Sequence, residues 1–489
     1  MNFPILSLTI FIPLIAGLII LLFPREKTTW PRVTALAAAI ITFVLTIIVY
    51  ASYDIAQGGY QFIEKVPWMP MWDISYHVGV DGISTPLLLM AGVVLFCGTA
   101  VSWNVSDRPR EFFAFLMFLG TSVLGVFASL DLFQLFFFFE LAIFPKYLMI
   151  VIWGYPKTRE YGAMKLTLYL FIGSVFALVG VLAIVFLSGA NTFDMLLLEQ
   201  FGFDIGFQQL WFPFVFFGFA VLAAVFPLHS WAPDGHVAAP TAVSMMLAGV
   251  EMKVGAFAAL RVGIMLLPEG AQIWSPLILA LATINVVYGA LIALVQTDFK
   301  YVIGFSSVSH MGLVLIGFAT LNKDGLLGSG LQMFSHGVMT ALFFSVVGMV
   351  YDRAHTRDIP KLGGLFQKMP AAAVAFIVAG LVSMGMPGFS GFIAEFPIFM
   401  GAWQVAPIVA IIAVLGILIT AGYILLVLRR VFFGDLKPEL AAVGDVSVLD
   451  KVSMAILVVM MIALGVFPSL MYPMVQSGVN YILALVGGA

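Results

Sequence analysis

Three carboxylates interrupt long apolar stretches of this sequence, namely Glu140, Glu251 and Glu395. Each stretch is long enough to cross a membrane, where a charged residue costs about 2.5–3.5 kcal/mol on insertion scales. Ionisable residues at that depth therefore tend to mark a polar pathway. These three residues are the first candidates for chemistry inside a membrane.

Basic side chains accompany the carboxylates at the same depth. Carboxylates and lysines can exchange protons once burial and neighbouring charges bring their pKa values toward neutrality, and histidine needs little shift. A chain of such groups is what a proton relay requires. The predicted relay consists of Glu140, Lys165, Lys253, His310, His336 and Glu395, with Lys146 and Glu251 as further members of the network.

Each of these residues also has a structural interpretation. Glu140 could bond one helix to another, Lys165 and Lys253 could be packed as neutral amines, and the two histidines could be satisfied packing residues. Arg261 falls in the last turn of its apolar stretch, so we expect its long side chain to snorkel to the interface.

A second polar cluster lies in the run Pro227-Leu228-His229-Ser230-Trp231-Ala232-Pro233-Asp234-Gly235-His236. His229, Asp234 and His236 could take part in proton transfer, but capping of a loop is an equally good interpretation. A structural zinc site needs four ligands, and only Asp234 lies near the two histidines. We therefore predict no metal site and no cofactor-binding residue in this chain.

The composition excludes a soluble domain. The residues are 62% hydrophobic and 10% charged, with a mean hydropathy of +1.10, which would expose far more apolar surface than water tolerates. The net charge of -3 and the lack of a basic stripe argue against a nucleic-acid partner. The expected surroundings are a lipid bilayer.

Apolar segments of about 20 residues predict helices, because only helices satisfy their own backbone hydrogen bonds in lipid. The fold class is therefore an all-α polytopic membrane protein with about fourteen transmembrane helices. Pro468 and Pro473 interrupt the last segment. The predicted spans are 3–23, 33–52, 84–104, 112–130, 132–153, 163–189, 210–230, 241–266, 274–296, 302–321, 326–351, 371–400, 403–428 and 452–486.

The basic residues of the loops predict the orientation. One set of alternate loops carries nearly all of them, and the other carries only Lys65 and Lys323. By the positive-inside rule the first set is cytoplasmic, which places both termini on the opposite side of a cell inner (plasma) membrane. The first set holds Arg25, Lys27, Arg32, Arg108, Arg110, Lys157, Arg159, Lys300, Arg353, Arg357, Lys361, Lys368, Arg429, Arg430, Lys437 and Lys451.

Two spans carry helix breakers, Pro227 in the seventh and Met386-Pro387-Gly388 in the twelfth. The breaks occupy corresponding positions of spans 4–8 and 9–13, as interrupted helices do in transporters built from inverted repeats. We expect two inverted five-helix repeats with broken helices at spans 7 and 12. The expected division is 1–111 for spans 1–3, 112–266 and 274–428 for the repeats, and 429–489 for a loop and the last span.

Four ordered motifs, spread over essentially the whole chain, resemble the antiporter-like membrane subunits of respiratory complex I (NADH–quinone oxidoreductase), most closely the subunit M (chain 4) branch. They are Gly79-Val80-Asp81-Gly82-Ile83-Ser84, Glu140 with Pro145 and Trp153-Gly154, the run from Pro227 to Pro240-Thr241, and Gln296-Thr297-Asp298-x-Lys300 followed by Ser306-Ser307-Val308-Ser309-His310-Met311-Gly312.

The resemblance implies roles for individual residues. Glu140 matches a fifth-span glutamate that is thought to respond to quinone chemistry elsewhere in the complex. Lys253 matches the central lysine of the eighth span, and His336 matches the eleventh-span histidine. Glu395 matches the glutamate where the proton path meets the outside. Positions equivalent to Lys165 and His310 also carry polar relay residues in such relatives.

The sequence departs from this pattern at Leu222, where such relatives place a lysine that pairs with the fifth-span glutamate. Lys146 and Glu251 stand where those relatives have apolar residues. We expect Lys146 to supply the missing countercharge to Glu140, although six residues put the two on different faces of a helix. Glu251 and Lys253, two residues apart, cannot face each other.

The resemblance implies a membrane-arm subunit that translocates protons, driven by electron transfer to quinone in partner subunits. Flavin mononucleotide (FMN), iron–sulfur clusters and quinone are expected in those partners, because this sequence has no dinucleotide fingerprint, P-loop or cysteine cluster. The expected neighbours are other membrane-arm subunits, including two further antiporter-like ones. The alternatives are a multi-subunit cation/proton antiporter subunit and the equivalent subunit of a hydrogenase or photosynthetic complex.

Overall fold

Long apolar helices make up most of the structure. The computed structural model describes residues 4–487, so residue 3, where the first span was predicted to begin, lies outside the described part. Within it, twelve helical segments are long and apolar enough to cross a membrane. They are α1 (Ile5–Leu22), α2 (Thr29–Ser52), α3 (Ser84–Val101), α4 (Pro109–Ala128), the pair α5 (Leu132–Leu141) and α6 (Ile143–Trp153), α7 (Arg159–Leu182), the continuous run α11 (Thr241–Met246), η4 (Leu247–Glu251), α12 (Met252–Ala258) and η5 (Ala259–Ile264), then α13 (Pro268–Val295), α14 (Phe299–Ala319), α15 (Lys323–Ala354), α18 (Pro407–Val427) and α19 (Val448–Val466).

The two spans with breakers are each divided into two shorter helices. The seventh consists of α9 (Ile205–Ala220) and α10 (Trp231–Ala238), and the twelfth of α16 (Pro370–Ser383) and α17 (Ser390–Val405). The prediction of one final span over 452–486 is wrong. Pro468 lacks a backbone N–H and its ring clashes with the preceding turn, so α19 ends at Val466 and a separate helix α20 (Tyr472–Val486) follows the turn η10 (Pro468–Leu470).

The all-α prediction missed an antiparallel hairpin between α2 and α3. Strand β1 (Gln61–Met69) pairs with β2 (Ile74–Val80), with Lys65 opposite His77. The Glu64 carboxylate accepts a hydrogen bond from the Leu6 N–H at 2.9 Å and so ties the hairpin to the start of α1. Lys65 pairs with Asp194 at 2.6 Å, next to the short helix α8 (Met195–Leu198).

Short helical segments complete the chain. Single 3₁₀ turns are η1 (Pro70–Trp72), η2 (Ser102–Asn104), η6 (Ile359–Lys361), η7 (Leu365–Gln367) and η9 (Pro438–Leu440). The π-helical segments η3 (Ala183–Leu187) and η8 (Leu428–Phe432) prolong α7 and α18.

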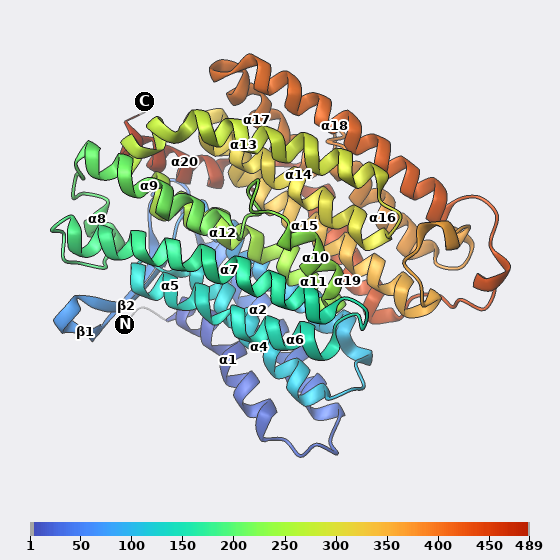
Figure 1. The fold of residues 1–489 in the computed structure, drawn as a ribbon. Helices are drawn as coiled ribbons and strands as arrows, with labels where there is room; N and C mark the ends of the chain where they lie inside the picture. Colours follow the sequence, from blue (N-terminus) through green and yellow to red (C-terminus); the bar gives the residue numbers. More distant parts are fainter. Residues whose placement is uncertain (1–3, 488–489) are drawn as a thin grey trace.

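The bundle has two chemically distinct ends. The hairpin and α20 lie at one end, and the loop between α18 and α19 lies at the other (Figure 1). The second end also gathers the Arg- and Lys-bearing loops. There Arg32 donates to the Val105 carbonyl, and Arg353 pairs with Asp450. We call these the hairpin end and the basic end.

The helices that carry the predicted relay lie at the centre of the bundle. In the most apolar 18-residue stretch of each helix, all residues of Thr241–Ile264 and of α15 are buried, and 94% of those of α14 are. For α2 and α19 the corresponding share is 33%, so these helices lie at the outside of the bundle. Lys253, His310 and His336 are therefore shielded from lipid by the surrounding helices.

Candidate functional site

Polar side chains from neighbouring helices stabilise the break between α9 and α10. The Phe226 N–H donates to the Asn285 side-chain oxygen at 2.6 Å, and the Asn285 amide donates to the Ala224 carbonyl at 2.7 Å. The Trp231 indole donates to the Val221 carbonyl at 2.9 Å. These bonds satisfy backbone groups that the break frees inside the membrane. We had not singled out Asn285, yet a lone asparagine in the apolar span 274–296 was a readable signal.

Lys253 is fully buried at the centre of its helix, between two π-helical segments. Its ammonium nitrogen donates to the Ala248 carbonyl at 2.5 Å, and no ion pair holds it within residues 4–487. The backbone of this helix packs directly on α15, since a Cβ at Gly249 would lie 3.1 Å from the Gly337 carbonyl oxygen. The two glycines thus bring the helices of Lys253 and His336 together.

Three buried histidines lie within electrostatic reach of Lys253. His236, His310 and His336 are each at most 1% exposed, and all three lie close enough to Lys253 for its charge to act on their rings. The rings of His310 and His336 stack with their centroids 5.3 Å apart. Neither ring nitrogen of His236 or His336 has a hydrogen-bond partner in the described chain.

His310 connects this group to Glu395. Its Nδ1 lies 2.9 Å from the Ser306 carbonyl oxygen, and its Nε2 lies 3.2 Å from the Ser383 carbonyl oxygen. The same Nε2 is 3.7 Å from Glu395 Oε1. Oxygen acceptors therefore flank both ring nitrogens, which is the arrangement that a proton-carrying imidazole needs.

Glu395 lies at the second break. It is 2% exposed and accepts a hydrogen bond from the Gln332 amide at 3.1 Å, while its Oε2 has no partner among residues 4–487. Gly385, with a φ of +62°, allows this close approach, because a Cβ there would lie 2.7 Å from Oε2. The break between α16 and α17 thus makes room for the carboxylate.

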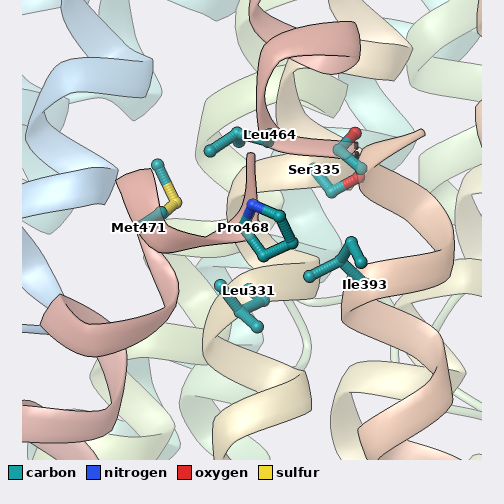
Figure 2. Close-up of a pocket in the computed structure, with 7 residues that line it drawn as sticks. Leu331, Ser335, Ile393, Leu464, Pro468 and Met471 are labelled. Carbon is teal, nitrogen blue, oxygen red and sulfur yellow. Dashed lines mark hydrogen bonds between the residues drawn. The ribbon is translucent and has the colours of Figure 1, made fainter. Parts of the chain in front are cut away.

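A small cavity lies near the second break, between α15, α17, α19 and the turn η10. Figure 2 shows Pro468 facing Leu331 and Ile393, with Leu464 and Met471 beside it. The cavity measures about 10 Å³, which is room for about one water molecule. At its wall, the hydroxyls of Ser335 and Ser390 lie 2.8 Å apart.

Lys146 pairs with Glu251, not with Glu140. The Lys146 ammonium and the Glu251 carboxylate are hydrogen-bonded, and each side chain is 1% exposed. The expected Lys146–Glu140 ion pair is therefore wrong for this structure, because Lys146 points inward to the helix of Lys253. Glu140 is half-buried in α5, and its Oε1 has no hydrogen-bond partner in the described chain.

Lys165 and the loop motif form a separate cluster. Lys165 pairs with Asp234 at 2.6 Å, and the Tyr301 hydroxyl donates to the same carboxylate at 2.8 Å. Lys165 and Asp234 are about one-fifth exposed, so they lie outside the fully buried group. His229 stacks on Phe226 and packs edge-to-face against Tyr288, next to the first break.

A polar cleft at the basic end leads toward the buried group. It measures about 840 Å³, and Pro240, Thr241, Lys300 and Asp352 are among the residues that line it. Lys300 is 5% exposed, donates to the Ala239 carbonyl at 2.6 Å and lies within electrostatic reach of His236. The sequence predicts Lys300 only as a loop cation, because its position before an apolar stretch carries no sign of burial.

Arg261 does not snorkel. It is 2% exposed and pairs with Asp81, itself fully buried, at 2.5 Å. Asp81 lies between β2 and α3, so the hairpin that the sequence analysis missed brings the partner to Arg261. Residues 4–487 contain no group of three or more His, Cys, Asp or Glu side chains that could hold a metal ion.

Comparison with known sequences assigns a family. The profile described as "NADH:quinone oxidoreductase/Mrp antiporter, TM" matches residues 129–420. NADH-quinone oxidoreductase subunit M of Rhodobacter capsulatus is 37% identical, and the match covers 98% of this chain and 96% of the relative. NAD(P)H-quinone oxidoreductase chain 4 of Gloeobacter violaceus is 36% identical, with 96% of this chain and 90% of the relative covered.

The fold has a counterpart among solved structures. A chain of respiratory complex I from Thermus thermophilus with bound NADH superposes with a TM-score of 0.91 at 28% identity. The superposition covers 99% of this chain and 100% of the other. The similarity therefore extends to the hairpin and to α20 as well as to the matched family region.

Proposed function

The chain belongs to the subunit M (chain 4) family of NADH–quinone oxidoreductases, and on that basis we propose that it translocates protons across the membrane through its buried ionisable residues. The observation that carries this proposal is the group at the centre of the bundle. Lys253 lies within electrostatic reach of three buried histidines, one of which lies 3.7 Å from a buried carboxylate.

In the proposed path, protons enter from the basic end, which we take to be the cytoplasmic side. The cleft supplies them to the buried group, and they leave from Glu395, beside the second break, toward the hairpin end. The path crosses from the unit 112–266 to the unit 274–428, the two proposed repeats. In order it runs through Lys300, His236, Lys253, His336, His310 and Glu395.

The energy for this transport comes from partner subunits. Moving one proton outward against about 150 mV requires roughly 3.5 kcal/mol, at 2.3 kcal/mol per 100 mV. In this proposal FMN, iron–sulfur clusters and quinone reside in other subunits of the complex, and this chain contributes no redox centre. The chain's own residues bind, hold and pass the proton.

In this proposal Glu140 receives the signal from a neighbouring subunit. It lies in α5 beside Phe137, which is 46% exposed, and Phe144, which is 65% exposed, so this side of the helix faces outward from the bundle. Two charges at short range interact by several kcal/mol inside a protein. A charge change at Glu140 would act on Lys146 and, through the Lys146–Glu251 pair, on the helix of Lys253.

Variants of Lys253 and Glu395 in the intact complex, reconstituted in liposomes, test the proposal. We expect Lys253→Met and Glu395→Gln to lower the number of protons pumped per NADH while NADH oxidation continues. Lys361→Met, which removes a cation that is 71% exposed at the basic end, is the matched control and should leave the ratio unchanged. An unchanged ratio in both assembled relay variants would reject the proposed function.

The same measurement separates the remaining candidate, a cation/proton antiporter subunit. The family profile covers both kinds of protein, whereas the similar chains from R. capsulatus and G. violaceus are quinone oxidoreductases. If the subunit were an antiporter, proton movement across the liposome membrane would respond to an imposed sodium gradient in the absence of NADH. We expect no such response.

A further inference from the structure

A buried ion pair closes the hairpin end of the helix that carries Lys253. Arg261 lies eight residues after Lys253 in the continuous helix Thr241–Ile264, which is about 12 Å along the axis. Its guanidinium pairs with Asp81 at 2.5 Å, and the two side chains are 2% and 0% exposed. The proposed proton path uses neither residue.

Hydrogen bonds extend this pair into a continuous network. The guanidinium donates to the Tyr60 hydroxyl at 3.1 Å, and Tyr60 donates to Glu199 at 2.7 Å. The Tyr481 hydroxyl donates to the other oxygen of the same carboxylate at 2.6 Å. The five residues come from separate segments of the chain, and all of these segments meet at the hairpin end.

The network leaves no opening around the guanidinium. Aromatic rings cover it, since its central carbon lies 5.2 Å from the ring centroid of Tyr60 and 5.0 Å from that of Phe257. Asp81 is in turn fixed by the Ser84 N–H at 2.8 Å and the Ile83 N–H at 3.0 Å, at the start of α3. Both partners are therefore held in place from two directions.

The chemistry of arginine makes this closure a barrier to protons. A guanidinium stays protonated under all physiological conditions, so it cannot accept a proton from Lys253 and pass it on. Fixed arginine charges also exclude protons and cations from narrow pores. A relay that continued from Lys253 straight along its own helix would end at a group that does not titrate.

We propose that Arg261 and Asp81 form a permanent proton barrier, which closes the direct route from Lys253 to the hairpin end and so directs protons sideways to the histidines and Glu395. The inference rests on the proposed function, because it assigns the barrier to the path through Lys253. Such a barrier is needed because the cleft at the basic end reaches Lys300 and Thr241, and Thr241 begins the helix of Lys253. An opening at Arg261 would join the two sides of the membrane and dissipate the gradient.

Passive proton leak through the intact complex in liposomes tests the barrier. A pH gradient is imposed without NADH, and an enclosed pH-sensitive dye reports its decay. We expect Arg261→Met to raise the leak rate about tenfold, which corresponds to about 1.4 kcal/mol of lost barrier. Arg261→Lys, which keeps a cation beside Asp81 but replaces the guanidinium with an amine that can release its proton, should also leak faster than the wild type.

A second variant distinguishes a leak caused by loss of the barrier from a leak caused by misfolding. Arg261→Met leaves Asp81 as an unpaired buried charge, whereas replacing both members of a buried pair by apolar residues is often neutral for stability. The double variant Asp81→Leu/Arg261→Met should therefore assemble and still leak. Lys65→Met, which breaks an ion pair at the same end but with a 44% exposed lysine, is the control and should not leak.

The route of the leak is tested by adding Lys253→Met to the leaking variant. We expect the added substitution to return the leak to the wild-type rate. The proposal is wrong if Arg261→Met and Asp81→Leu/Arg261→Met both assemble and leak no faster than the wild type. It is also wrong if the leak persists after Lys253→Met is added. Failure of the proposed function gives a different result, because Lys253→Met alone would then leave NADH-driven pumping unchanged.

Discussion

The role that we propose for each buried ionisable residue follows from its hydrogen-bond and ion-pair partners. Lys253 has only a backbone carbonyl as hydrogen-bond partner, and His336 has no such partner in residues 4–487, so both can change protonation without breaking an ion pair. Lys146 and Glu251 are instead locked together. Lys253 and His336 are therefore suited to proton transfer, whereas the Lys146–Glu251 pair is suited to sensing a nearby charge.

The Lys146–Glu251 pair makes a prediction about stability. Removing one member of a buried pair leaves an uncompensated charge and is expected to cost about 3–5 kcal/mol, whereas removing both is often neutral. Lys146→Met should therefore lower the thermal stability of the purified complex, and Lys146→Met/Glu251→Leu should restore it. A double variant as unstable as the single one would show that the two residues do not act as a pair.

Among the helices, close packing matters as much as the buried charges. The helix of Lys253 and α15 approach through Gly249 and Gly337, and the broken helices are stabilised by side chains such as Asn285. Small residues allow such approach where no hydrophobic effect drives helices together. The relay geometry therefore depends on residues that carry no charge.

A single methyl group should disturb this packing. A Cβ at Gly337 would clash with the Met90 sulfur and lie 2.7 Å from the Gly249 carbonyl oxygen. Gly337→Ala must therefore displace the Met90 side chain and push the two helices apart, at about 1–3 kcal/mol for overpacking. We expect fewer protons per NADH and a lower melting temperature of the complex. At Gly98 the nearest atom would be 3.6 Å away, so Gly98→Ala serves as the control. Equal behaviour of the two variants would contradict this account.

The helices and their breaks were predictable because backbone groups in lipid must be hydrogen-bonded within the protein. Pro227 and Met386-Pro387-Gly388 stand in the two interrupted helices, as their chemistry predicts. The partners of the charges were not predictable. Arg261 was misjudged because its partner Asp81 lies 180 residues earlier, after a hairpin that the hydropathy pattern does not reveal. Lys300 was missed because burial at a helix start depends on tertiary packing.

For the whole molecule, the two ends of the bundle differ in a way that suits directional transport. The basic end has a cleft of about 840 Å³ that reaches Lys300 and Thr241. At the hairpin end the buried Arg261–Asp81 pair covers the Lys253 helix, and a cavity of about 10 Å³ lies near the second break. In our proposal the entrance at the basic end and the exit at Glu395 are displaced sideways from each other. A proton therefore crosses the membrane only by way of the histidines between them.

This central claim is a single connected path, and the pumping ratio of a double variant tests it most directly. Protons pumped per NADH are measured for the wild type, Lys253→Met, Glu395→Gln and Lys253→Met/Glu395→Gln, in the same liposomes. If the two residues act in series, each single variant and the double variant lose the same number of protons. Losses that add in the double variant would mean that Lys253 and Glu395 serve separate routes, and the account would be wrong.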